Sequence, residues 1–565
     1  MKLILTDYIA SLKEEKELDS LMEELLREKG FEVTFPPKKG VRQYGVDIYA
    51  VGKDPEDNKK KVFLITVKQG NLDRKNWHGT EQSLEPSLRE IVSVFVKNNI
   101  PKAHSSLPVK IIIAHNGIND PAIQQNWAGF TKEYPNFEFE IWQLETIVNM
   151  VFSSLISERL FSDEARVLLR KTIINIYNPE YDLSDYVRLI DSLIDKIKYQ
   201  KKKNTRIKNL KKIKLVLGII FSYCKKENDS RLAIKASEIT ILRVWKYLTD
   251  KKIPFKDEQS LLFIDLLTFK LQVNEYYLSK IIPVCQIKDG FYRHSIDPVT
   301  YNLIVYEHLG ILALIGLESF LLYEIFKEKN EQLARLLSIR VSQCITGVIE
   351  IFNNNKIAYN PRLDDQIIEI NLTFLLLHKS DRIEAIEALL VGLIKGILDG
   401  KRLMNIAPLF SNNHEELIEL EVNYSKRAEY DYKSSSLLTC LAEWTVILDN
   451  SKLYNTIRFV IEKEFAGVEL TLWFPESDTE SFFLTQCALP DSGYCLTGIK
   501  LPESFEDFKR IVFSEYLNNC PEQGFAFFRT GVWSIGLLAS RHYRTYVFPS
   551  YWRQLIQNKS ELKYD

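Results

Sequence analysis

Two neighbouring segments bring together an acid, a hydroxyl and a lysine, which are side-chain types found in hydrolytic metal sites. The stretch YGVDIYAVGKDPEDNKKKVFLITVKQG, residues 44–70, is typical of two short strands joined by a charged turn. Alternation along the second strand places Thr66 and Lys68 on one face. A register that sets Asp47 opposite residue 66 or 68 adds the acid to that face, and Gly45 lets a backbone or a substrate approach just before it. We therefore expect Asp47, Thr66 and Lys68 to form one polar cluster at the edge of a buried sheet.

An amphipathic helix precedes these strands and supplies further acids. In KELDSLMEELLREKG the leucines and the methionine recur at helical spacing, and Gly30 is a natural stop. Asp19 flanks this apolar stripe, and Glu23 lies one turn further on. If the helix packs on the sheet, Asp19 comes near Asp47. Carboxylates beside a lysine suit Mg²⁺ or Mn²⁺, which binds carboxylate, water and phosphate oxygens, and the lysine would orient or deprotonate the attacking water.

The order of elements indicates an α/β layer. The helix is followed by a strand, FEVTF, and then by the two strands described above. A helix from Pro86, a buried strand VKIIIAHNG, a helix AIQQNWAGFTKEY and a strand FEFEIWQ complete the region. The order α-β-β-β-α-β-α-β predicts a mixed sheet with helices packed on it.

These residues resemble a known family. The stretch LDSLMEELLREKGFEV, with YGVDIYA and FLITVKQG after it, is similar to the PD-(D/E)XK restriction-endonuclease superfamily, and most similar to its Mrr-like branch, over residues 15–145. The resemblance implies a restriction-endonuclease-like α/β sandwich that hydrolyses DNA phosphodiesters with Mg²⁺. It further implies that Asp19 is the helix acid, Asp47 the metal-binding aspartate and Lys68 the catalytic lysine.

One position departs from the family pattern. The family has Glu, Asp or Gln two residues before the lysine, and this chain has Thr66. A neutral hydroxyl is a weaker metal ligand than a carboxylate. Three interpretations stay open: Thr66 acts through a water, Glu23 or Gln69 substitutes for the acid, or the site is damaged. The plain alternative to all of them is a surface salt bridge between Asp47 and Lys68 with no catalytic role.

Two basic stretches are candidates for contact with nucleic acid. The first follows the lysine, where Arg74, Lys75, Trp77 and His78 combine charge with rings suited to phosphate contact and base stacking; a polar loop is the alternative. The second, KIKYQKKKNTRIKNLKKIK at 196–214, has no acid and suits backbone binding through counterion release; a solvated loop between helices is the alternative. Its candidate binding residues are Lys201, Lys202, Lys203, Arg206 and Lys208.

The pattern of apolar residues changes twice along the chain. We expect a nuclease-like α/β domain at 1–160, a helical bundle or array for sensing or assembly at 161–430, and an α+β domain at 431–565. The fold class is thus multidomain α/β plus α. Near the C-terminus, Arg529, Arg541, Arg544 and Arg553 lie among many aromatic residues. A packed core or a homodimer interface explains this mixture better than nucleic-acid stacking.

The bulk composition sets limits on the function. The net charge of the 565 residues is −1, so a nucleic-acid signal must be local. The 7 cysteines are scattered without CxxC, which indicates reduced thiols in a cytoplasmic protein, with neither a disulfide framework nor a zinc knot. We expect no secretory signal and no transmembrane helix, and we find no Walker A loop, GxGxxG or GxSxG.

The leading hypothesis is a metal-dependent DNA endonuclease fused to a sensor or assembly region. Such fusions are typical of effectors in bacterial anti-phage defence or restriction systems, which implies a partner protein of that system. A homo-oligomer is expected because cutting both strands needs two sites. The alternative is an inactive nuclease fold that serves as a nucleic-acid-binding or scaffold subunit, and a weaker one is a binder of a small signalling nucleotide.

Overall fold

The chain divides into two compact units. The computed structural model describes residues 2–35, 44–79, 83–153, 163–178, 181–292, 297–410, 414–480, 493–518, 524–546 and 551–553. Unit 1 comprises residues 1–236 and 256–266, and unit 2 comprises residues 237–255 and 267–565. The chain is mostly helical with a small mixed sheet near its N-terminus, as the expected class of α/β plus α requires. The boundaries expected near 160 and 430 stay a prediction.

Unit 1 is built on one five-stranded sheet whose strands lie in sequence order. The strands are β1 Glu32–Phe35, β2 Ile48–Lys53, β3 Lys60–Lys68, β4 Val109–His115 and β5 Glu138–Trp142. Neighbours are antiparallel from β1 to β3 and parallel from β3 to β5. The element order read from the sequence is therefore confirmed. The carboxyl ends of β3 and β4 meet at one edge of the sheet, because these two strands are parallel.

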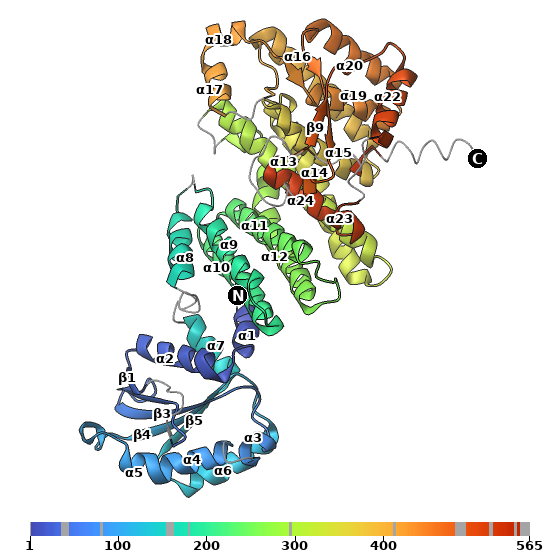
Figure 1. Ribbon diagram of the computed structural model, residues 1–565. Coiled ribbons are helices and arrows are strands. Elements are labelled where there is room, and N and C mark those ends of the chain that lie inside the picture. The colour runs from blue at the N-terminus through green and yellow to red at the C-terminus, as the bar shows by residue number, and fades with distance from the viewer. Residues whose placement is uncertain are drawn as a thin grey trace. The chain divides into compact units, whose positions relative to one another are not determined.

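The central strands are buried on both faces, which explains their nearly continuous apolar sequence. Val62 and Leu64 on β3 belong to a core with helices on one side of the sheet. Those helices are α3 Arg74–His78, α4 Leu84–Glu90, the π-helical turn η2 Ile91–Phe95, α5 Val96–Asn98 and α6 Gln124–Glu133. Figure 1 shows α2 Asp19–Glu28 and α7 Leu144–Ser153 over the other face.

The first amphipathic helix differs from expectation at its start. The chain forms a π-helical turn, η1 Glu14–Leu18, and α2 continues from it. The predicted apolar stripe, Leu18, Leu21, Met22, Leu25 and Leu26, is buried. Gly30 follows with φ +83°, a left-handed conformation suited to glycine, so the predicted helix stop is confirmed.

Helices complete unit 1. They are α1 Lys2–Ala10, α8 Asp163–Asn175, α9 Ser184–Lys198 and α10 Lys203–Lys226. Helix α10 packs against α9 and also against α1, the helix that precedes η1. Two further helices, α11 Ser230–Asp250 and α12 Glu258–Cys285, contribute residues to both units.

Unit 2 is a helical array with short strands. Its long helix α13 Pro298–Phe326 packs on α14 Glu331–Asn354 and α15 Ile367–Lys379. The other helices are α16 Ile383–Met404, α17 His414–Val422, α18 Tyr424–Glu429, α19 Leu437–Ile447, α20 Ser451–Glu464, α22 Phe505–Asn518, α23 Ala526–Arg529 and α24 Ser534–Tyr543. The strand pairs are β6 Ser434–Ser435 with β7 Glu469–Leu470, and β8 Leu472–Pro475 with β9 Gly493–Leu496.

Arginines near the C-terminus belong to the core of unit 2. The Arg541 guanidinium pairs with buried Glu238. The Arg553 Nε lies 2.8 Å from Oε1 of Glu443, and both side chains are buried. Buried charges require such partners because an unpaired one is costly. The packed-core interpretation is confirmed for these two arginines, whereas Arg529 is exposed.

Two helices of unit 2 are apolar and long enough to cross a membrane by length and composition. They are α13 and α14, and about half of the apolar window in each is buried within the structure. A buried core helix passes the same test, so the absence of a membrane segment stays a prediction. Among the described cysteines, Cys224, Cys285, Cys344, Cys440 and Cys495 are free. Cys487 and Cys520 lie outside the described residues.

Candidate active site at the carboxyl ends of β3 and β4

Asp47 enters the sheet through a tight turn. Gly45 has φ +78°, and a Cβ built on it would lie 2.4 Å from the backbone oxygen of Ser87 in α4. Both the conformation and the close approach require glycine. The pairing of Ile48 with Ile65 sets Asp47 opposite Thr66, which is one of the expected registers. The turn therefore fixes the position of the aspartate relative to β3.

The Asp47 carboxylate is held by the strand beside it. Its Oδ2 accepts a hydrogen bond from the backbone N–H of Val67 at 2.7 Å and from the hydroxyl of Thr66 at 3.3 Å. Burial raises the pKa of the Asp47 carboxyl, against the Val67 N–H and the nearby Lys68, and the charge of Glu14 raises this pKa further. The site thus concentrates negative charge that a cation would stabilise.

Glu14 is the acid that the structure places beside the lysine. The Lys68 Nζ lies 3.2 Å from its Oε1, and the backbone N–H of Gln69 donates to its Oε2 at 3.3 Å. Glu14 is the first residue of the π-helical turn, and such turns often occur at functional sites. The helix was expected to begin later, so Glu14 was not among the predicted site residues. The acidic run EEKE just before the apolar stripe was the available signal.

Asp19 and Glu23 lie elsewhere on the same segment. The Asp19 Oδ1 accepts from the backbone N–H of Ser20 at 2.6 Å. The Glu23 Oε1 lies 2.8 Å from the Arg27 guanidinium, one turn along the helix. Within the described residues, no hydrogen bond or ion pair joins either acid to Asp47. The acid expected from the helix is supplied to this cluster by Glu14, and metal binding by Asp19 and Glu23 stays a prediction.

Two buried residues at the carboxyl end of β4, His115 and Asn116, hold the loop that follows Lys68. The imidazole of His115 contacts the Gly70 carbonyl at 3.1 Å and the Asn119 side-chain oxygen at 2.8 Å, and burial lowers its pKa. The Asn116 side-chain oxygen accepts from the Gly70 N–H at 2.8 Å. The sequence signal was a His-Asn-Gly run directly after an apolar strand. These residues position the end of β3.

The candidate nucleic-acid contacts beside the site differ in exposure. Arg74 and Lys75 are exposed at the start of α3. His78 is exposed too, and its Nδ1 lies 2.5 Å from Oε2 of Glu85. The predicted contact of Trp77 with nucleic acid is corrected, because its indole is buried and packs edge-on against the aromatic rings of α6. The buried ring offers no face on which a base could stack.

The basic run of 196–214 is partly neutralised within unit 1. The Lys203 Nζ lies 2.7 Å from Oδ2 of Asp257, and Lys208 forms an ion pair with Glu17. Lys201 and Lys202 are exposed. The Arg206 Nε is buried without a hydrogen-bond partner in the described residues. Phosphate contact by Lys203 or Lys208 would therefore compete with an acid that already holds the lysine, and nucleic-acid binding by this run stays a prediction.

The site residues fit a divalent cation that uses few protein ligands. Both hydrogen bonds to the Asp47 side chain within the described residues fall on Oδ2, which leaves Oδ1 available. Glu14 is the second carboxylate, near enough for its charge to raise the pKa of Asp47, and its two oxygens accept from the Lys68 ammonium and the Gln69 N–H. The described part of the chain contains no group of three or more His, Cys, Asp or Glu side chains close enough to hold a metal. Mg²⁺ commonly binds through one or two carboxylates together with waters and substrate phosphates.

A second charged cluster lies at the opposite end of the same sheet. Asp54, Lys61 and Lys110 are all buried there. The Asp54 Oδ2 lies 2.9 Å from the Lys61 Nζ and 3.0 Å from the Lys110 Nζ. Against its burial, the hydrogen bonds from Lys61, the Glu56 backbone and Lys110 lower the pKa of Asp54 to about 2. Because each buried charge is paired with side chains of the opposite charge, we interpret this cluster as a structural network.

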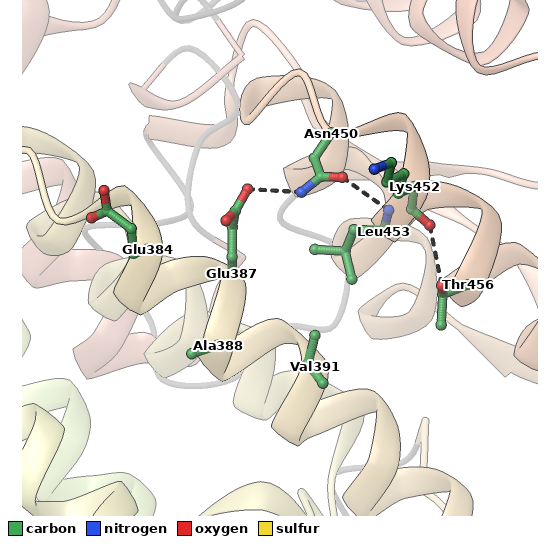
Figure 2. A pocket seen from close by; sticks show the side chains of 8 residues that line it. All are labelled: Glu384, Glu387, Ala388, Val391, Asn450, Lys452, Leu453 and Thr456. Atoms are coloured by element: carbon green, nitrogen blue, oxygen red, sulfur yellow. Dashed lines mark hydrogen bonds between the residues drawn. The ribbon is translucent and has the colours of Figure 1, made fainter.

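Unit 2 contains a surface pocket of about 580 Å³ between α16 and α20. Figure 2 shows Glu387 accepting from the Asn450 side chain across it. The Asn450 side chain also caps α20 by accepting from the Leu453 N–H. The Glu387 and Asn450 side chains thus serve the packing of the two helices.

Comparisons with known proteins find no match among family models, curated proteins or solved structures.

Proposed function

We propose that unit 1 carries a metal-dependent nuclease site that hydrolyses DNA phosphodiester bonds. The observation that supports this most is the meeting of Glu14, Asp47, Thr66 and Lys68 at one sheet edge. These residues come from three separate elements. Ligands of α/β sheets bind outside the carboxyl ends of the strands, which is where this cluster lies.

In this proposal Asp47 and Glu14 hold Mg²⁺ or Mn²⁺, which would lower the pKa of a bound water and offset charge on the phosphate. Thr66 donates its hydroxyl hydrogen bond to Asp47 and so orients the carboxylate. Lys68 positions or deprotonates the attacking water. Arg74 and Lys75, exposed just after the strand, contact phosphates of the substrate.

The wider proposal keeps the expected context. The nuclease works as a homo-oligomer, since cutting both strands needs two sites, and acts in the cytoplasm as an effector of an anti-phage or restriction system. The competing candidate is an inactive nuclease fold that binds nucleic acid or serves as a scaffold. The neutral Thr66 in place of an acid favours that candidate.

The test is cleavage of supercoiled and linear DNA with Mg²⁺ or Mn²⁺ by wild type, Asp47→Ala and Lys68→Ala. The matched control is Glu133→Gln, which removes the acid of an exposed ion pair with Arg89 in the same unit. Cleavage by wild type and the control, with loss in both site variants, supports the proposal. Cleavage that survives both site substitutions would place the chemistry elsewhere.

A further inference from the structure

Helix α10 is linked by side chains to the turn that carries Glu14. Lys208 on α10 forms an ion pair with Glu17, the fourth residue of η1. The other oxygen of Glu17 accepts from the backbone N–H of Lys13 at 2.8 Å. Lys13 directly precedes Glu14, and its carbonyl accepts from Leu18 to close the turn. The Glu17 carboxylate therefore joins α10 to the backbone beside the site acid.

A second route runs from α10 to the segment that follows Lys68. Helix α10 packs on α1, and the Lys212 Nζ lies 6.0 Å from the centroid of the Tyr8 ring on α1. The carbonyl of Ile9, in the last turn of α1, and that of Leu12, just after the helix, accept from the side chain of Asn116 at 2.9 and 2.8 Å. The same Asn116 holds Gly70, two residues after Lys68. Both Glu14 and Lys68 are thus connected to one helix.

We propose that α10 controls the geometry of the site, with Lys208 and Glu17 as positioning residues that hold Glu14 beside Lys68. The effect on activity rests on the proposed nuclease site, whereas the positioning of Glu14 rests on the contacts described above. It gives Lys208 a different role from the phosphate contact that the basic run predicts. Displacing α10 from η1 would release Glu14 and weaken the binding of a divalent cation.

The experiment compares Lys208→Met with Lys214→Met in the full-length chain. Lys214 lies on the same helix, is similarly buried and pairs with Asp265, so it matches Lys208 in charge and setting without touching η1. Hydrogen exchange is measured in metal-free protein for peptides covering 12–20, and Mn²⁺ affinity is measured by calorimetry without DNA. Lys208→Met is expected to speed exchange in 12–20 about threefold to fivefold, the effect of losing a partly exposed ion pair.

Mn²⁺ affinity separates positioning from simple electrostatics. Removing a positive charge near a cation site should by itself strengthen Mn²⁺ binding, whereas the loss of Glu14 positioning weakens it, here by about threefold to fivefold. Lys208→Arg should restore both readouts, and Glu17→Gln should reproduce the faster exchange. Equal behaviour of Lys208→Met and Lys214→Met in exchange and in affinity would overturn the inference.

The proposed metal site and the positioning role of Lys208 are contradicted by different results. A wild-type protein that binds no Mn²⁺ contradicts the proposed metal site, while the exchange measurement still decides whether Lys208 holds η1. A wild-type protein that binds Mn²⁺, with unchanged exchange in Lys208→Met, contradicts the positioning role and leaves the proposed nuclease site intact.

Discussion

The two ends of the unit 1 sheet both gather charged side chains, but the charges are balanced differently. At the amino ends of β3 and β4, Lys61 and Lys110 share Asp54 and have further acids around them. At the carboxyl ends, Lys68 has one close acid, Glu14, and Asp47 keeps an oxygen without a partner in the described residues. The first arrangement satisfies its own charges, and the second leaves capacity for a ligand.

The pKa directions express the same difference. Asp54 has its pKa lowered to about 2 by its lysine partners, so its charged form stabilises the fold. Asp47 has its pKa raised by burial, so its charged form costs stability. A residue that costs stability where it stands is typical of functional sites. The comparison therefore supports a structural role for the amino-end cluster and agrees with the chemistry proposed for the carboxyl-end cluster.

The same substitution at the two ends should separate activity from stability. Lys68→Met is expected to lower DNA cleavage by at least about 100-fold, because the group that positions or deprotonates the water is lost. Lys110→Met is expected to lower the free energy of unfolding by about 3 kcal/mol, because buried Asp54 loses a partner. Cleavage rates and urea denaturation of both variants measure the two effects, with exposed Lys102→Met as control.

The assignment of the two ends would be contradicted if Lys110→Met abolished cleavage or if Lys68→Met left it unchanged. A Lys110→Met protein that folds normally and cannot cut DNA would move the chemistry to the amino ends of the strands. A Lys68→Met protein that cuts normally would reduce its ion pair with Glu14 to a surface salt bridge.

The two aspartates should give opposite pH dependences of stability. The folded pKa of Asp54 lies below its ordinary value of 3.8, so its contribution is present above pH 3.8 and is lost as the pH falls toward about 2. The folded pKa of Asp47 is raised, so its cost is present at neutral pH and disappears as the pH falls through that pKa. Asp47→Asn should thus raise the free energy of unfolding at pH 7 above that of wild type.

Urea denaturation between pH 7 and pH 2.5 measures both dependences. The gain from Asp47→Asn should shrink toward low pH, whereas Asp54→Asn should be destabilising at pH 7 and approach wild type in acid. A destabilising Asp47→Asn at pH 7 would mean that Asp47 belongs to a satisfied structural network like that of Asp54.

Thr66 gives the smallest expected effect. Thr66→Val keeps the shape of the buried side chain and removes the hydroxyl that donates to Asp47. The loss of one such hydrogen bond is worth about 1 kcal/mol, so cleavage should fall by about fivefold. Thr66→Ser keeps the hydroxyl and serves as the control in the same assay. Loss of cleavage as complete as in Lys68→Met would make the hydroxyl a direct participant in catalysis.

Periodicity in the sequence was sufficient for the sheet and its hairpin. The apolar run of β3 followed from alternation, and so did the shared face of Thr66 and Lys68. Alternation left Asp47 opposite residue 66 or 68, and the pairing of Ile48 with Ile65 in the structure selects Thr66. Glu14 could not be read in the same way. Its position depends on a π-helical turn, which breaks the helical spacing from which Asp19 and Glu23 were chosen.

Burial could not be predicted from the sequence where a residue type is common both at the surface and in the core. Trp77 follows two basic residues and reads as a stacking side chain, yet tertiary packing places it against α6. The basic run predicts that Lys208 contacts phosphate, yet in the structure Lys208 forms an ion pair with Glu17, which is distant in sequence. Neither the burial of Trp77 nor the ion pair of Lys208 is determined by the neighbouring sequence, because each depends on which distant element the fold packs against the residue.

The most direct test of the central claim compares the acid assigned by the structure with the acid assigned by the sequence. Mg²⁺-dependent cleavage of supercoiled DNA is measured for wild type, Glu14→Gln and Asp19→Asn under identical conditions. The account predicts that Glu14→Gln loses at least about tenfold more activity than Asp19→Asn, the effect expected for a charge at the reacting centre. The larger loss in Asp19→Asn would contradict it.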